Sequence, residues 1–247
     1  IVLGLPVAFA LLLSAIGLML HMDLFSADIL AQALVNGVDS FPLLAIPFFI
    51  IAGEVMSAGG LSKRIVALAI SLVGHKQGGL GYVVILTSVL LAGLSGSAVA
   101  DAAALVSILY PMMKKANYPN SHSVGLLASG GIIAPVIPPS LPLIIMGVAG
   151  NISIAKLFIG GIVPGLMMGM ALALTWYFLV RKEPLEIGKK TTPAERRTAL
   201  KDGIWALLLP IIIIGGIRFG VFTPTEAAVV AAVYAIVVSI FVYRELT

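Results

Sequence analysis

GLSGSAVAD, residues 93–101, lies in the middle of a long apolar stretch of the chain. The motif places Ser95, Ser97, two glycines and the carboxylate of Asp101 at the depth of a membrane. An ionisable side chain inside a membrane span costs several kcal/mol unless it faces protein or water. By default, such a residue marks the path of an ion or of a polar solute.

A second irregular stretch, APVIPPSLP at residues 134–142, interrupts the next apolar segment, residues 124–148. Its four prolines remove four backbone donors and forbid a continuous helix. We therefore expect two half-helices with an unwound middle. Two broken spans that follow each other closely are a sequence signature of a transporter binding site.

The composition is that of an all-helical polytopic membrane protein. Hydrophobic residues make up 60% of the chain and charged residues 11%, and the mean hydropathy is +1.13, whereas soluble domains carry about 25% charged residues. The net charge of +4 comes from basic residues between apolar spans, so it indicates topology and not a nucleic-acid partner. The chain has no cysteine, and its three histidines lack ligand spacing, which excludes disulfides and thiolate metal sites.

A helix needs about 20 residues to cross the hydrocarbon core, and this length divides the chain. Residues 2–20 fill a first span, and we expect an acidic loop with Asp23, Asp28 and Asp39 to follow. Residues 65–73 form a short amphipathic segment that need not cross. The remaining spans are expected at residues 41–56, 157–180, 204–217 and 227–243, with a polar loop at 181–203.

Residues 80–93 and 102–113 are each too short to span comfortably, and no charged loop joins them. This pattern predicts a re-entrant helical hairpin, because non-helical backbone at this depth persists only inside protein or beside a watery cavity. The positive-inside rule supports the hairpin. If the hairpin enters and leaves the membrane on the cytoplasmic side, only Lys156 and Arg218 among the basic residues fall on the other side of the membrane. The basic residues on the cytoplasmic side are then Lys63, Arg64, Lys76, Lys114, Lys115, Arg181, Lys182, Lys189, Lys190, Arg196, Arg197, Lys201 and Arg244.

Two helix breaks at one depth bring together groups that bind ions of both signs. Helix N-termini favour an anion, whereas unwound carbonyls and serine hydroxyls coordinate a small hard cation such as sodium. Asp101, one turn beyond the serines, either neutralises a bound cation or only caps the second hairpin helix. The other groups that supply this chemistry are Ser95, Gly96, Ser97, Pro138, Pro139 and Ser140.

Two acidic residues outside the breaks have competing explanations. Thr223, Pro224 and Glu226 form the pattern of a capping box at the start of the last helix, so we expect a structural role there. Glu54 lies near the end of the second span, and nothing local pairs it. For Glu54, a functional role and an ordinary structural position both stay open.

Four ordered motifs resemble the large membrane subunit, the DctM-like M subunit, of tripartite ATP-independent periplasmic (TRAP) transporters. They are PLLAIPFFIIAGEVMSAGGLSKR at residues 42–64, GLSGSAVADAAA at 93–104, GGIIAPVIPPSLP at 130–142 and GVFTPTEAA at 220–228. Two phrases, LVNGVDSFPLLAIPFF at 34–49 and GIWALLLPIIIIGG at 203–216, are similar to the branch associated with the sugar acid diketogulonate. Sialic acid and C4-dicarboxylate members are relatives of that branch.

The resemblance implies a sodium-coupled, elevator-type importer of a small organic acid, with the fold of the ion-transporter superfamily. It implies a small four-helix membrane subunit and a periplasmic solute-binding protein as partners, in the lipid bilayer of the bacterial inner membrane. Sodium ions serve as coupling ions, and no other cofactor is implied. The family's sodium and substrate sites fall here on Ser95, Ser97, Asp101 and, in the proline-broken helix, Ser140.

The family architecture has two inverted repeats, and we expect this chain to be a piece that holds one repeat and the start of the second. The expected parts are scaffold and arm helices at residues 1–74, half of the transport domain at 75–156 (hairpin 80–116, broken helix 124–149), a membrane helix at 157–180, a cytoplasmic loop at 181–203 and the first helices of the second repeat at 204–247. The second hairpin and the second broken helix are then missing.

Two other classes of function compete with transport as explanations of these motifs. The tetrapeptide GLSG at residues 93–96 fits the nucleophile motif of an intramembrane serine protease. That chemistry needs a histidine within hydrogen-bond reach of the serine, and His21, His75 and His122 all fall at span ends. A purely structural membrane scaffold leaves the costly broken spans unexplained. We therefore expect a transporter and not an enzyme.

Overall fold

The computed structural model describes residues 4–181, 183, 185, 188 and 190–246, and every regular element among them is helical. The chain divides into two compact units, Ile1–Ser40 and Phe41–Thr247. Residues 2 and 3 of the first expected span, and Lys182 and Lys189 of the expected cytoplasmic set, lie outside the described residues.

The first unit contains two helices, α1 (Val7–His21) and α2 (Ala27–Val38). α1 occupies most of the first expected span. The acidic loop expected after it is wrong, because most of that segment is α2. The Ser26 hydroxyl caps α2 by accepting a hydrogen bond from the Ile29 amide at 3.4 Å, and Asp28 lies in the first turn, where the helix dipole favours negative charge.

The second unit holds the remaining helices, which begin with a short 3-10 turn, η1, that leads directly into α3 and end with a short π-helical turn, η2, that continues α11. In chain order they are η1 (Phe41–Leu44), α3 (Ala45–Ala58), α4 (Leu61–Val73), α5 (Gly79–Ser95), α6 (Ala98–Lys115), α7 (Asn120–Gly131), α8 (Leu141–Ala149), α9 (Ile154–Val180), α10 (Pro193–Arg218), α11 (Pro224–Val237) and η2 (Val238–Val242).

Four helical stretches among the described residues are long and apolar enough to cross a membrane: Phe41–Ala58, Ile154–Val180, Pro193–Arg218 and Pro224–Val242. They coincide with the four spans expected after the first one. One boundary was wrong, however. The expected polar loop at residues 181–203 ends early, because α10 already begins at Pro193 behind a capping box of Thr192 and Glu195.

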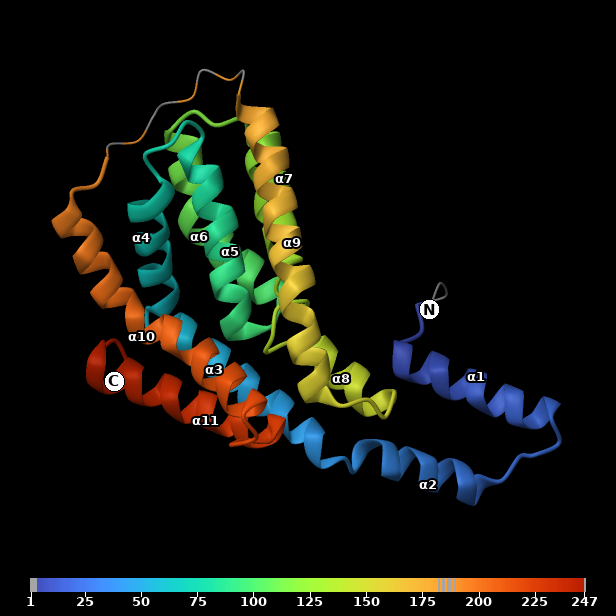
Figure 1. Cartoon of the computed structure of the whole chain (residues 1–247). Coiled ribbons are helices and arrows are strands. Elements are labelled where there is room, and N and C mark those ends of the chain that lie inside the picture. Colours follow the sequence, from blue (N-terminus) through green and yellow to red (C-terminus); the bar gives the residue numbers. More distant parts are fainter. Residues whose placement is uncertain (1–3, 182, 184, 186–187, 189, 247) are drawn as a thin grey trace. The chain divides into compact units, whose positions relative to one another are not determined.

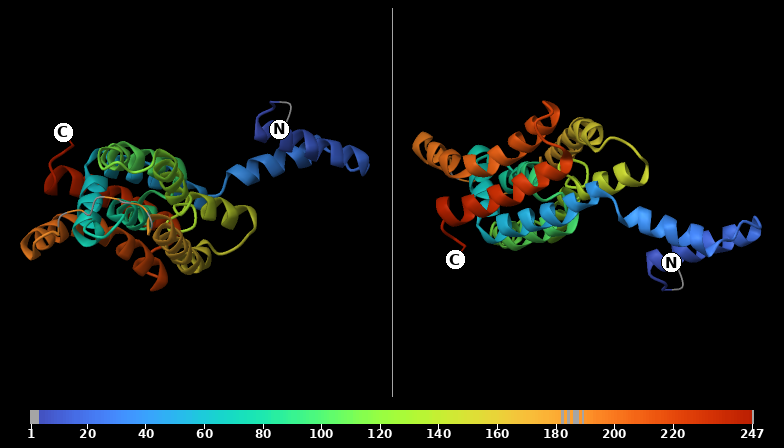
Figure 2. Two further views of the ribbon diagram at one scale, coloured as in Figure 1. Left: turned by 90° about the horizontal axis from the view of Figure 1, so that it is seen from above. Right: turned by 90° about the horizontal axis from the view of Figure 1, so that it is seen from below.

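Within the second unit, the helices with the two breaks stand together. α5 lies beside α6, α7 and α9, and α4 packs against α5 on one side and α10 on the other (Figure 1). α3 and α11 run side by side along much of their length (Figures 1 and 2). A continuous core of buried apolar side chains joins these helices, including Phe49, Leu105, Phe158 and Trp176. The hairpin and the broken helix are therefore held by packing on several sides.

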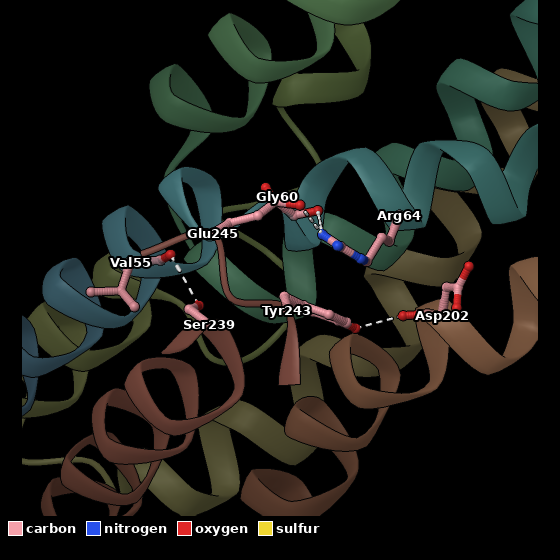
Figure 3. Close-up of polar contacts among 7 residues, drawn as sticks. All are labelled: Val55, Gly60, Arg64, Asp202, Ser239, Tyr243 and Glu245. Carbon is pink, nitrogen blue, oxygen red and sulfur yellow. Dashed lines mark hydrogen bonds and ion pairs between the residues drawn. The ribbon is translucent and has the colours of Figure 1, made fainter. Parts of the chain in front are cut away.

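Arg64 joins the turn between α3 and α4 to the end of α11. Its guanidinium forms an ion pair with Glu245 at 2.8 Å, donates to the Gly60 carbonyl at 3.0 Å and lies 3.7 Å from the ring centre of Tyr243 (Figure 3). The Tyr243 hydroxyl in turn donates to the Asp202 carbonyl of α10 at 2.5 Å. Three elements that are distant in sequence are thus tied together at one end of α3.

Candidate functional site

The first break is the tip of the helical hairpin formed by α5 and α6. α5 ends at Ser95 and α6 begins at Ala98, so only Gly96 and Ser97 lie between the two helices. The break is therefore shorter than the expected tip at residues 93–101, and Asp101 belongs to the first turn of α6. Gly96 has a φ of +60°, in the left-handed region that favours glycine.

Hydrogen bonds fold the tip back on itself. The Ser95 hydroxyl donates to Oδ1 of Asp101 and accepts from the Ser97 amide at 3.2 Å. The Ser97 hydroxyl caps α6 by accepting from the Ala100 amide at 3.4 Å. Because Ser97 fills the N-cap position, Asp101 is not the cap of this helix. Its carboxylate is instead bonded to a serine hydroxyl from the other arm of the hairpin.

Asp101 retains a free acceptor in a buried position. The residue is only 5% exposed, and its Oδ2 atom has no hydrogen-bond partner among the described residues. A buried, unpaired carboxylate oxygen is costly, so it calls for a cation or a donor that the described residues do not supply. Of the two roles predicted for Asp101, the cap of α6 is wrong because Ser97 fills that position, and neutralisation of a bound cation stays a prediction.

The second break separates α7 from α8, as the four prolines predicted. Ser140 is completely buried and caps α8 by accepting from the Leu143 amide at 3.4 Å. Its hydroxyl donates to the Pro135 carbonyl at 2.5 Å, across the proline-rich stretch. Ser140 thus fixes both the start of α8 and the path of the backbone that precedes it.

The two breaks are in direct contact. A Cβ atom placed on Gly96 would collide with the Pro139 carbonyl and lie 2.9 Å from the Cα of Ser140. A Cβ on Gly93 would lie 3.7 Å from the Pro138 carbonyl. The structure therefore brings all the residues singled out in the two motifs to one place, with the hairpin tip packed on the backbone of residues 138–140.

A cavity of about 530 Å³ opens beside the hairpin tip, between α3 and α6. At Gly53, the backbone of α3 lies close to Ser95 at the end of α5, because a Cβ on Gly53 would lie 3.5 Å from Ser95. The α6 side is lined by small residues at helical spacing, Ala100, Ala103 and Ala104, which leave the space open. The polar side chains that line the cavity include Glu54, Ser57, Ser95, Ser97, Asp101 and Ser107.

Sequence reasoning had found part of this lining and missed part of it. Glu54 had been singled out because nothing local pairs it, and the structure places it at the cavity wall. Ser57 and Ser107 were missed. A signal for Ser107 existed, since Ala100, Ala104 and Ser107 recur every three or four residues and so share one face of a helix. No comparable signal predicted that α3 packs beside the hairpin tip, because that contact joins residues that are distant in the sequence.

The arrangement offers binding groups for an anion and for a hard cation. The N-termini of α6 and α8 meet at the contact between Gly96 and Ser140, and their positive dipole ends favour an anion. The Asp101 carboxylate, serine hydroxyls and backbone carbonyls of the breaks are oxygen ligands of the kind that alkali cations use. No group of three His, Cys, Asp or Glu side chains that might hold a metal ion occurs among the described residues.

The protease alternative finds no base at this site. His21 ends α1, His75 lies between α4 and α5, and His122 lies in the first turn of α7. None of the three lines the cavity that Ser95 faces. The Ser95 hydroxyl is bonded to a carboxylate instead.

Comparison with known proteins identifies the family. All 247 residues, 1–247, match the family described as "Tripartite ATP-independent periplasmic transporter, DctM component". The chain is 58% identical over 247 residues to the 2,3-diketo-L-gulonate TRAP transporter large permease protein YiaN of Escherichia coli (strain K12), covering 100% of this chain and 58% of that protein.

Two further relatives carry other substrate names. The sialic acid TRAP transporter large permease protein SiaM of Vibrio cholerae is 42% identical over 99% of this chain and 57% of its own length. The C4-dicarboxylate TRAP transporter large permease protein DctM of Rhodobacter capsulatus is 36% identical over 99% of this chain and 59% of its own length. The chain thus spans less than two thirds of the length of these relatives. It belongs to the DctM family of multi-pass membrane permeases of bacterial TRAP transporters, which are transporters and not enzymes.

Proposed function

We propose that the full-length protein is the large membrane subunit of a sodium-coupled tripartite importer that carries a small organic acid across the bacterial inner membrane. The observation that carries the proposal is the contact between the two breaks, at Gly96 and Ser140, next to the unpaired Asp101 carboxylate oxygen. A purely structural scaffold gives no reason to keep a buried, unpaired carboxylate at membrane depth.

Each group of the site has a distinct role in this proposal. Sodium binds the carboxylate of Asp101 together with oxygens of Ser95, Ser97 and the proline-rich break, and so neutralises the buried charge. The bound cation orders the hairpin tip. The organic acid then contacts the ordered tip and the N-termini of α6 and α8, with Ser140 holding α8 in place. Coupling arises because the acid has a higher affinity for the sodium-ordered tip than for the free one.

Movement follows an elevator scheme in this proposal. The hairpin (residues 80–116) and the broken helix (124–149) move as one rigid body, since Gly96 packs directly on the backbone of the second break. The scaffold includes α3, whose Gly53 makes a close but side-chain-free contact with Ser95. A glycine at such a contact leaves a smooth surface for sliding. The inverted repeats of the family supply the second hairpin and the second broken helix in the full-length protein.

The proposed substrate class rests on the names of three relatives. Their names specify diketogulonate, sialic acid and C4-dicarboxylates, which are all carboxylates. We propose a sugar acid as the substrate, because the relative named for diketogulonate is 58% identical over the whole chain. The proposed partners are a small four-helix membrane subunit and a periplasmic solute-binding protein that delivers the acid.

Uptake of a radiolabelled sugar acid tests this function. Proteoliposomes would contain the full-length subunit with its small partner, with the binding protein added outside, and would be assayed with and without an inward sodium gradient. We expect uptake only with the gradient, and a strong loss in Ser97→Ala, which lacks the cap of α6. Sodium-independent uptake would contradict the coupling.

A further inference from the structure

Over residues 203–217, α10 has a buried face and a face that is exposed within the described part of the chain. The buried residues of this helix are Gly203, Ala206, Leu209, Ile213 and Ile217, which recur every three or four positions and form the inner face. Exposed apolar side chains occupy the other side, with exposed fractions of 44% for Ile204, 40% for Trp205 and 65% for Ile211. In a multi-pass membrane protein, such an apolar face contacts either lipid or another membrane helix.

The same outward face continues into basic residues toward the start of the helix. Successive residues turn by about 100°, so Lys201 and Arg197, four and eight positions before Trp205, lie on its side of the helix. Both are exposed, and neither forms an ion pair within the described part of the chain. Within the described residues, an exposed apolar surface therefore passes through Trp205 into two cations that lie one turn apart.

The length of the apolar stretch sets the depth of these residues. Residues 204–217 rise only about 21 Å at 1.5 Å per residue, against a hydrocarbon core of about 30 Å. This stretch is too short to cross the core alone, so about six further residues from the turns before Ile204 complete the crossing within the membrane-length stretch Pro193–Arg218. Arg197 then lies at the membrane surface, and the long side chain of Lys201 extends its charged end to the level of the phosphates.

A pocket of about 550 Å³ lies at the same end of α10. Its lining is basic and partly apolar, as a lipid headgroup with its glycerol requires: Lys190, Thr191, Pro193, Arg196, Arg197 and Leu200. The Thr191 hydroxyl fixes the approach to this pocket by donating to the Ser71 carbonyl of α4 at 2.7 Å. Two acidic groups lie nearby: the Glu195 carboxylate is bonded to the Thr192 amide at 2.8 Å, and the exposed Asp202 lies about 60° around the helix from Trp205, on the side away from Lys201 and Arg197. The cationic side chains, and not the capped helix end, therefore provide the charge for an anion.

We propose that this basic end of α10 binds the headgroup of an anionic phospholipid of the cytoplasmic leaflet. Arg197 and Lys201 contact the phosphate from the outward face of the helix, Arg196 and Lys190 add charge from the pocket, and Trp205 and Leu200 contact the upper acyl chain. Positively charged pockets beside membrane helices bind anionic headgroups in this way, at about 1 kcal/mol per Lys or Arg. The site anchors α10, and through it α4, which packs on the hairpin helix α5.

Lipid-dependent thermal unfolding of the full-length subunit tests the site and does not depend on transport. The purified protein in a neutral detergent would be titrated with phosphatidylglycerol, with phosphatidylcholine and with inorganic phosphate. The test variant is Arg197→Gln/Lys201→Gln. The matched control is Lys114→Gln/Lys115→Gln, which removes the same charge from an exposed pair at the end of α6.

We expect phosphatidylglycerol alone to raise the unfolding temperature of the wild type. In the test variant, the concentration needed should rise about thirtyfold, which corresponds to the loss of two contacts of about 1 kcal/mol each. The control variant should respond like the wild type. An equal response to phosphatidylcholine, an equal response to free phosphate, or an unchanged response in the test variant would each overturn the proposal.

Discussion

Gly96 packs directly against Ser140, so the tip of the hairpin rests on the start of α8 with no side chain between them. A Cβ on Gly96 would lie 2.9 Å from the Ser140 Cα, and the backbone of Gly96 has a φ of +60°. Both features require glycine at this position. The contact makes two stretches of backbone that are separated by more than forty residues into one binding site.

Gly96→Ala should therefore abolish or strongly reduce uptake while leaving the protein in the membrane. The added methyl group forces the tip away from residues 139 and 140, and a displacement of about 1 Å at a positioned site costs on the order of a hundredfold in rate. Initial uptake rates in proteoliposomes measure the effect. Gly125→Ala in α7 is the control, because a Cβ there meets no atom within 4 Å. Equal rates for both variants would show that the contact is irrelevant to transport.

Ser140→Ala should impair transport more than it impairs folding. The variant loses the cap of α8 and the bond to the Pro135 carbonyl, and loss of a cap costs about 1 kcal/mol of stability. Ser153→Ala removes the equivalent cap of α9, which lies outside the cavity. We expect similar decreases in unfolding temperature for the two variants, but a raised apparent KM for the acid only in Ser140→Ala. A raised KM in both Ser140→Ala and Ser153→Ala would show that Ser140 acts only as a helix cap.

Arg64→Gln should lower the unfolding temperature, because it breaks the ion pair with Glu245 and the stacking on Tyr243 at once. The pair is partly exposed, with side-chain exposures of 24% and 35%, so solvent limits the expected loss to about 1 kcal/mol. Lys63→Gln, at the exposed neighbouring position, should have almost no effect. Arg64→Lys keeps the charge but loses the planar stacking, and should fall between the two. Equal unfolding temperatures for Arg64→Gln, Arg64→Lys and Lys63→Gln would contradict the role given to Arg64.

Much of the helical architecture was predictable from the sequence, because its causes are local. The prolines at 135, 138 and 139 lie close together and each lacks a backbone donor, so the second break was predictable from backbone chemistry, whereas the single prolines at 111, 164 and 210 lie inside α6, α9 and α10. The capping box at Thr223 and Glu226 was recognised and is present, with the Thr223 amide donating to Glu226 at 2.7 Å. Length and hydropathy were enough to locate the four membrane-length stretches.

The errors have equally definite causes. Thr192-Pro-Ala-Glu195 has the same capping pattern as Thr223-Pro-Thr-Glu226, but the polar residues around it suggested a loop, and the start of α10 was missed. The aspartates at 23, 28 and 39 likewise suggested a loop and concealed α2, although its sequence is mainly apolar and Ser26 and Asp28 are typical of a helix start. The cavity wall formed by Gly53, Glu54 and Ser57 could not be found in this way, since packing of α3 on the hairpin is a tertiary contact.

The most direct test of the central claim is the sodium dependence of uptake in Asp101→Asn. The variant keeps the size of the side chain but removes the charge next to the proposed cation. Loss of a charge-assisted contact of about 1.5–3 kcal/mol should raise the sodium concentration for half-maximal uptake by about tenfold or more. Glu183→Gln, a carboxylate away from the cavity, should leave it unchanged. If Asp101→Asn has the sodium dependence of the wild type, the hairpin tip does not bind the coupling ion.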